Sequence, residues 1–173
     1  MSVQGEDGLN LTLQRLLDQA AVREVHLRYC RGIDRMDWTL VRSCYHPDAI
    51  DDHGSYVGGV EGFIEWAQQL LAGFESTTHF TGNQLVEIEG DSAWAEHYAR
   101  AYHRRPAGSG IPAVDLVANV RYIDRMEKRG GEWRIAKRVL TVDSDRADPV
   151  IDLYASADIK RSRRDRGDPS YAR

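Results

Sequence analysis

Two short segments of the sequence carry residue types that move protons. The first, Tyr29–Asp37, contains Asp34 near the end of an amphipathic stretch, and the second, Thr77–Asn83, contains His79. If these segments meet in a buried pocket, the Asp34 carboxylate would fix the tautomer of the His79 ring and stabilise its protonated form. We therefore expect Asp34 and His79 to form a proton-transfer pair, with His79 as the base.

The neighbours of Asp34 and His79 bear on this expectation. Asp34 lies on one flank of the apolar stripe of its helix, but an aspartate at a helix end commonly caps the helix or meets solvent, and Asp37 is the exposed alternative. His79 would share a strand face with two threonines, and with Asn83 if the strand continues. This polar face makes Asn83 a candidate for binding the substrate.

Two tyrosines are further candidates. Tyr29 continues the apolar stripe, so it is either a core aromatic residue or a hydroxyl that donates to a carbonyl or leaving group. With 3.6 residues per turn, Tyr29 and Asp34 would be separated by roughly 140° on a straight helix, so they share a pocket only if the helix ends or tilts there. Tyr45 is a similar candidate for contact with the substrate.

Two residues of the later strands are also candidates. His97 lies on a strand face of alanines, which leaves room either for a ligand or for close helix packing. Arg138 is either an exposed strand arginine or a clamp for a substrate carboxylate or enolate oxygen. We expect neither a metal nor another cofactor, because no phosphate loop follows a strand and no standard metal spacing connects His46, Asp48, Asp52 and His53.

The hydrophobic pattern changes its period once along the chain. A four-residue recurrence that includes Leu13, Leu17 and Val25 predicts a helix from Leu11 to about Gly32. Shorter helices are predicted at Trp38–Tyr45 and Val60–Gly73, with a possible bent strand between them. From Thr78 onward, alternation predicts strands that include Ser92–Arg104, Val114–Lys128 and Trp133–Val142. Helices followed by hairpin-linked strands indicate an α+β fold.

The 173 residues suit one domain, and the net charge of −4 gives no basic field for a nucleic acid. We expect residues 1–10 to be frayed, residues 11–145 to form the domain, and residues 146–173 to be an extension with a solvated basic tail. Cys30 and Cys44 are expected to be reduced, buried thiols. Without a membrane-spanning apolar run or a signal peptide, we expect a cytoplasmic location.

Several of these motifs resemble the SnoaL-like branch of the NTF2-like superfamily. They are the Tyr29-x-x-Gly32-x-Asp34 end of the first helix, the His46-Pro47-Asp48-Ala49 turn and the Gly-Glu-Trp-Arg-Ile of the last strand. The resemblance covers roughly residues 11–142 and implies a cone, with helices packed into a curved, mixed or antiparallel sheet. This fold hosts enzymes and binding proteins alike, so the fold alone does not determine the function.

Three enzymes within the superfamily make the expectation more specific. Bile-acid dehydratases, scytalone dehydratase and hexachlorocyclohexane dehydrochlorinase pair an aspartate with a histidine to remove a proton, and Asp34 and His79 occupy matching motif positions. Tyr29 matches the tyrosine of the bile-acid enzymes, whereas the dehydrochlorinase has a lysine there. The resemblance implies a cofactor-independent lyase or isomerase acting on a small hydrophobic, cyclic carbonyl or hydroxy compound.

Two alternatives remain open, and one expectation concerns assembly. The chain could be a non-catalytic protein that binds a hydrophobic ligand, or the small subunit of a ring-hydroxylating dioxygenase with a large iron–sulfur partner. The predicted outer face of the sheet carries Trp94, Tyr98 and Tyr102, a large aromatic patch for a monomer. We therefore expect a homodimer or homotrimer built on that face.

Overall fold

The computed structural model describes residues 3–108, 110–150 and 159–172. Helices α1 (Val3–Arg35) and α2 (Trp38–Ser43) come first and are followed by β1 (Tyr45–Asp52), β2 (Val57–Gly59) and α3 (Val60–Ala72). The other strands are β3 (Ser76–Glu89), β4 (Ser92–Arg105), β5 (Val114–Arg129) and β6 (Glu132–Pro149). A short 3₁₀ helix spans Pro169–Tyr171.

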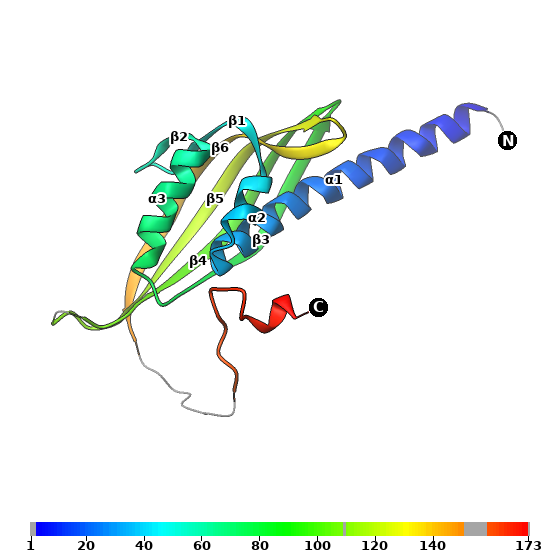
Figure 1. Ribbon diagram of the computed structural model, residues 1–173. Coiled ribbons are helices and arrows are strands. Elements are labelled where there is room, and N and C mark those ends of the chain that lie inside the picture. Colours follow the sequence, from blue (N-terminus) through cyan, green and yellow to red (C-terminus); the bar gives the residue numbers. More distant parts are fainter. Residues whose placement is uncertain (1–2, 109, 151–158, 173) are drawn as a thin grey trace.

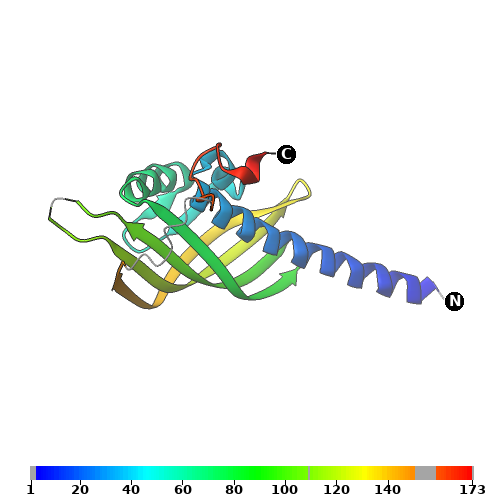
Figure 2. The ribbon, with the colours of Figure 1, turned by 90° about the horizontal axis from the view of Figure 1, so that it is seen from below.

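The strands form one sheet in the order β2-β1-β6-β5-β4-β3. β1 is parallel to β6, and the other neighbouring pairs are antiparallel. The sheet is twisted and curved, and α3 and the C-terminal half of α1 lie against one of its faces (Figure 1; Figure 2). This arrangement confirms the expected α+β fold with a mixed sheet.

The end of α1 differs from the prediction. The helix continues past Gly32 to Arg35 and ends where Met36 adopts a φ of 52°. Gly32 is buried beside α2, and a Cβ at this position would lie 2.7 Å from Cγ2 of Val41. Glycine therefore permits a close helix contact here instead of ending the helix, and Asp34 belongs to the last turn of α1.

The N-terminal half of α1 projects beyond the sheet (Figure 1; Figure 2). Leu13 and Leu17 are 52% and 55% exposed, so the predicted buried stripe holds only further along the helix, where Val22 and Val25 are buried. Helical structure already begins at Val3, within the segment that the sequence predicted to be frayed. The physical reason for the exposed leucines is that the sheet ends before the helix does.

The outer face of β4 carries the predicted aromatic residues. Trp94 and Tyr98 are 54% and 40% exposed, while Tyr102 is half-buried and donates to Asp115 at 2.6 Å. Assembly through this face stays a prediction.

Light scattering at micromolar concentration should give the mass of two or three chains, and Trp94→Glu should lower that mass by placing a charge in the contact. A monomeric wild-type protein would contradict this expectation.

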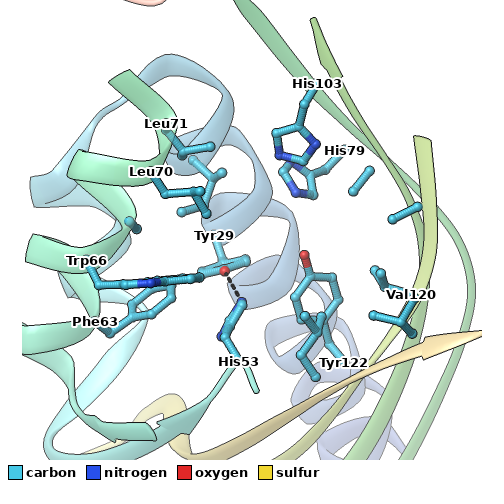
Figure 3. Close-up of a pocket in the computed structure, with 16 residues that line it drawn as sticks. Tyr29, His53, Phe63, Trp66, Leu70, Leu71, His79, His103, Val120 and Tyr122 are labelled. Carbon is cyan, nitrogen blue, oxygen red and sulfur yellow. Dashed lines mark hydrogen bonds between the residues drawn. The ribbon is translucent and has the colours of Figure 1, made fainter. Parts of the chain in front are cut away.

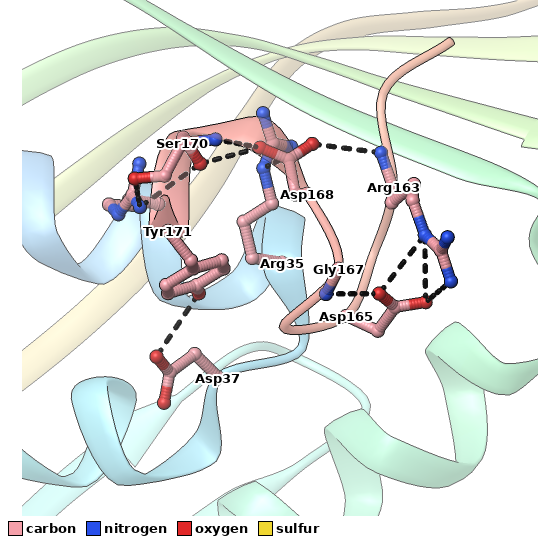
Figure 4. A network of polar contacts seen from close by, with 9 residues as sticks. Arg35, Asp37, Arg163, Asp165, Gly167, Asp168, Ser170 and Tyr171 are labelled. Carbon is pink, nitrogen blue, oxygen red and sulfur yellow. Dashed lines mark hydrogen bonds and ion pairs between the residues drawn. The ribbon is translucent and has the colours of Figure 1, made fainter. Parts of the chain in front are cut away.

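The sequence predicted a solvated tail at the end of the chain, and most of residues 159–172 are exposed, but part of this segment lies against the end of α1. β6 continues to Pro149, and residues 159–172 return to the end of α1. There Tyr171 donates to Asp37 at 3.1 Å, Arg166 contacts the same carboxylate at 3.0 Å, and Arg35 lies 3.6 Å from Asp168 (Figure 4). Asp37 of the first segment and Asp168 of the second thus each pair with an arginine of the other segment. Residues 151–158 and 173 lie outside the described residues.

Two further expectations concern the cysteines and membrane-spanning segments. Cys30 and Cys44 are buried and form no disulfide, as predicted. No helix among residues 3–108, 110–150 and 159–172 has the length and apolar character needed to cross a membrane.

Candidate active site

A pocket of about 190 Å³ lies between α1, α3 and the inner face of the sheet (Figure 3). Its wall is mostly apolar, with Ile33 from α1, Leu70 and Leu71 from α3, and Val120 from β5. The polar side chains in this wall are those of Tyr29, His53, Trp66, His79, His103 and Tyr122. A mostly apolar wall with a few converging polar groups is typical of a site for a small organic molecule.

Asp34 and His79 meet at the rim between α1 and β3. One Asp34 oxygen lies 2.7 Å from Nδ1 of His79, and the other accepts the His79 backbone N–H at 2.9 Å. Only 6% of the His79 side chain and 13% of the Asp34 side chain are exposed. With its proton on Nδ1, the His79 ring keeps the Nε2 lone pair for a proton from the pocket.

A second carboxylate–imidazole pair shares this pocket, and the sequence analysis did not find it. Nδ1 of His53 bonds to one oxygen of Asp51, while the other oxygen accepts the Tyr45 hydroxyl proton at 2.6 Å. Nε2 of His53 lies 3.3 Å from the Tyr29 hydroxyl (Figure 3). Asp51 and His53 are two positions apart on an extended segment, which places both side chains on one face and was the available signal.

Two tyrosines present hydroxyl groups near these pairs. Tyr29 contacts His53, as just described, and the Tyr122 hydroxyl points into the pocket (Figure 3). Among the described residues, the Tyr122 hydroxyl has no hydrogen-bond partner. Burial is the main cause that raises the pKa of both tyrosines, so both hydroxyls keep their protons and can donate.

A buried ion pair lies beneath this aromatic wall. Arg138 donates to both oxygens of Asp124 at 2.7 Å. The exposed fraction is 0% for the Arg138 side chain and 1% for the Asp124 side chain. The guanidinium carbon lies 4.1 Å from the Tyr29 ring centre and 4.6 Å from that of Tyr122. This stacking fixes the rings whose hydroxyls serve the pocket.

Residues 14–139 match the sequence model of a family described as the SnoaL-like domain. The chain belongs to the SnoaL-like family. A relative, the uncharacterized protein Rv2910c of Mycobacterium tuberculosis, is 26% identical over 136 residues, which is 76% of this chain and 89% of the relative. The match to the family runs from within α1 to the first part of β6 and therefore includes both carboxylate–imidazole pairs.

Solved structures share the SnoaL-like fold of this chain. One is a hexachlorocyclohexane dehydrochlorinase, LinA type 2, with a TM-score of 0.73 and 20% identity, covering 86% of this chain and 99% of that one. Another, provisionally named scytalone dehydratase and from Novosphingobium aromaticivorans, has a TM-score of 0.70 and 17% identity, covering 81% and 93%. At these identities, the similarity shows the fold alone.

The SnoaL-like pocket does not contain every residue that the sequence suggested. Asn83 is exposed and follows a break in the β3–β4 register after Thr81, so the strand does not carry it onto the face of His79. Tyr45 is buried behind the wall, where it holds Asp51. Arg138 is fully buried, and Asp124 occupies the donors that a substrate carboxylate would need.

His97 is also buried away from the pocket lining. It is 0% exposed, and its ring stacks on that of His26 with the ring centres 4.0 Å apart. His26, His97 and Asp124 have ligand atoms within 4.8 Å of one another, a spacing that a metal ion could use. The Arg138 guanidinium, however, holds both Asp124 oxygens and places a positive charge beside them, so this donor set does not suit a divalent cation.

His103 lines the pocket although it lies near the end of β4. Burial, and then the nearby charge of His79, lowers the pKa of His103 from 6.5 to about 4, and burial also lowers that of His97 to about 4. These rings stay neutral in the folded protein at neutral pH, and His103 can act as a polar wall group without adding charge.

The lowered pKa values predict a loss of stability in mild acid. The unfolded chain binds protons at His97 and His103 near pH 6.5, whereas the folded chain does so only near pH 4, so the free energy of unfolding falls between these values. Thermal unfolding at about pH 5 should therefore give a lower Tm than at about pH 7.5. His97→Gln should reduce this difference, and an equal Tm at both pH values would contradict the prediction.

Proposed function

We propose that this SnoaL-like protein is a cofactor-independent lyase or isomerase that uses His79 and Asp34 to move a proton on a small hydrophobic molecule. The observation that supports this most directly is the 2.7 Å contact between the two side chains at an apolar pocket. Such an arrangement supplies a base with a fixed tautomer and a counter-charge for the imidazolium that forms. The names of the solved structures with the same fold, a dehydrochlorinase and a dehydratase, agree with this class of reaction.

In this proposal, each polar group has one task. Nε2 of His79 takes a proton from carbon, and Asp34 holds the ring through Nδ1 and stabilises its positive charge. The Tyr29 hydroxyl donates to the oxygen that gains negative charge, on either a carbonyl or a leaving hydroxyl group. The apolar residues of the wall bind the carbon skeleton and exclude water.

The size of the pocket limits the substrate. An apolar cavity of about 150 Å³ holds one benzene ring, so a pocket of about 190 Å³ suits one substituted ring. Among the residues that the structure describes, the pocket lining includes no arginine or lysine for an anionic group, and the buried Arg138 is already paired with Asp124. We therefore infer an uncharged cyclic hydroxy or carbonyl compound as the substrate.

The proposed pair can be tested without a substrate. Asp34→Asn should change the NMR titration of the His79 ring, because the amide offers neither the negative charge nor the same acceptor to Nδ1. Asp37→Asn is a matched control three residues further along the chain, because the Asp37 carboxylate accepts hydrogen bonds from the Leu40 backbone N–H and the Tyr171 hydroxyl instead of from His79. An identical His79 titration in Asp34→Asn would mean that the two residues do not interact.

The function itself is tested by screening neutral cyclic hydroxy-ketones and related compounds for elimination, isomerisation and exchange of α-hydrogens with ²H₂O. The proposal expects at least one of these reactions, and it expects the reaction to depend on His79. Ligands that bind the pocket without any reaction would favour the alternative of a binding protein.

A further inference from the structure

The His53–Asp51 pair is a second proton-transfer unit facing the same pocket. Asp51 is 0% exposed, and only 9% of the His53 side chain is exposed. Both Asp51 oxygens are occupied, one by Nδ1 of His53 and the other by the Tyr45 hydroxyl. The Tyr45 hydroxyl and the His53 ring thus hold the Asp51 carboxylate in place beside Nδ1 of His53.

Nε2 of His53 connects this pair to Tyr29. The hydroxyl of Tyr29 lies 3.3 Å from that nitrogen and belongs to a residue that lines the pocket. Burial raises the pKa of Tyr29, so the hydroxyl cannot give up its proton and remain charged. It can pass a proton on only if it receives another at the same time, and Nε2–H of a protonated His53 is placed to supply it.

We propose that Asp51, His53 and Tyr29 form the acid side of the reaction, delivering a proton to a departing hydroxyl group while His79 removes a proton from carbon. This inference rests on the proposed function and narrows its substrate to alcohols that lose water. A hydroxyl group is a poor leaving group unless it is protonated, whereas halide and carboxylate groups leave as anions. A proton relay of this kind would therefore help only the departure of a hydroxyl group.

The atoms and charges of this step balance. The C–H bond breaks, its proton goes to Nε2 of His79, and its electron pair becomes the new C=C bond. The C–O bond breaks, and the oxygen keeps that electron pair and takes the Tyr29 proton as water leaves. Tyr29 takes the Nε2 proton of His53, so one imidazolium is lost as another forms, and solvent then restores both rings.

The proposed relay needs a positive charge on His53 at the start of the reaction, and the groups around the ring decide whether that charge is compensated. Asp51 supplies the negative charge, and Tyr29, Tyr45 and Tyr122 face the site as neutral hydroxyls because burial is the largest cause raising each pKa. Arg138, a buried cation that contacts Tyr29 and Tyr45, is already paired with Asp124. The pocket can therefore hold a charge at His53 without leaving a buried charge uncompensated.

The test compares two leaving groups on one ring, using 3-hydroxycyclohexanone and 3-acetoxycyclohexanone or the equivalent pair from the screen. Acetate leaves as an anion and needs no proton. His53→Gln should lower elimination of water by about 10²-fold or more, the usual contribution of a positioned acid, but elimination of acetate by no more than about threefold. Exchange of α-hydrogens with ²H₂O should persist in the variant, because His79 is intact.

Each outcome has one meaning. Equal losses for both leaving groups would overturn the inference and make His53 a structural residue, while the proposed function would stand. Turnover that does not respond to His79→Ala, or a wild-type protein that turns over no compound, would overturn the proposed function and this inference together.

Two aspartates provide a matched comparison. Asp51→Asn should show the same preference for acetate as His53→Gln. Asp52→Asn should leave both rates unchanged, because the Asp52 carboxylate bonds to the Gly54 backbone N–H instead of to His53. An Asp51→Asn variant that matches Asp52→Asn in both rates would exclude the relay.

Discussion

His79→Ala is expected to lower kcat by about 10²–10⁴-fold on any substrate that the wild-type protein turns over, because a positioned general base contributes this much. The loss should fall on the rate and not on affinity, since the apolar wall supplies most of the binding. Ligand affinity measured by calorimetry should therefore stay within about tenfold of the wild-type value. The folded state should persist, because His79 lies at the rim of the pocket.

Turnover can also be measured in a double-mutant cycle of Asp34 and His79. Asp34→Ala should also reduce turnover, because the ring loses its orientation and its counter-charge. The double variant should be hardly slower than His79→Ala alone, since the two residues act as one unit. Tyr29→Phe should cost less than His79→Ala and should act on the rate more than on binding. Independent, additive losses for Asp34 and His79 would contradict the proposed pair.

Removing one partner of the Arg138–Asp124 pair should cause the largest loss of stability. Asp124→Ala leaves a fully buried guanidinium without its bidentate acceptor, and breaking a buried pair in this way costs about 3–5 kcal/mol. Urea unfolding should show this as a lower midpoint with a similar slope. Because whole proteins have a free energy of unfolding of about 5–15 kcal/mol, the variant should be near the limit of folding.

A double variant and a surface control make this prediction specific. Asp124→Leu combined with Arg138→Met removes both charges and should recover most of the loss, because no buried charge is left alone. Glu61→Ala removes a bidentate partner of Arg42 at the exposed surface and should have little effect on unfolding. A double variant as unstable as Asp124→Ala would mean that packing, not the unpaired charge, causes the loss.

Local pattern allowed much of the fold to be predicted from the sequence. The change from a four-residue to a two-residue period separated helices from strands, and the alternation of β4 placed Ala95 inward and Trp94 outward, as observed. The order of these elements, with the motif around Asp34, indicated the SnoaL-like fold. Periodicity predicts these features because the backbone of a single helix or strand fixes which of its side chains share a face. This holds whichever element packs against that face.

Pattern also has a clear limit, and β1 shows it. Here Asp51 is 0% exposed, whereas its apolar neighbour Ile50 is 44% exposed, the reverse of the usual order. The alternation is correct, but only packing against α1 and α3 decided which face turned inward. For this reason the sequence analysis considered Asp52 and His53 only as possible metal ligands, which it rejected, and missed the pair of His53 with Asp51.

The sequence by itself determined the element types, the shared faces and the pairing of Asp34 with His79, whose contact the structure places at 2.7 Å. Only the tertiary structure decided the surroundings of the other polar candidates. Arg138 could have faced solvent or a substrate, and it faces Asp124 instead. A buried charge takes the partner that packing brings within reach, and residues 14 positions apart on neighbouring strands meet only when the sheet forms.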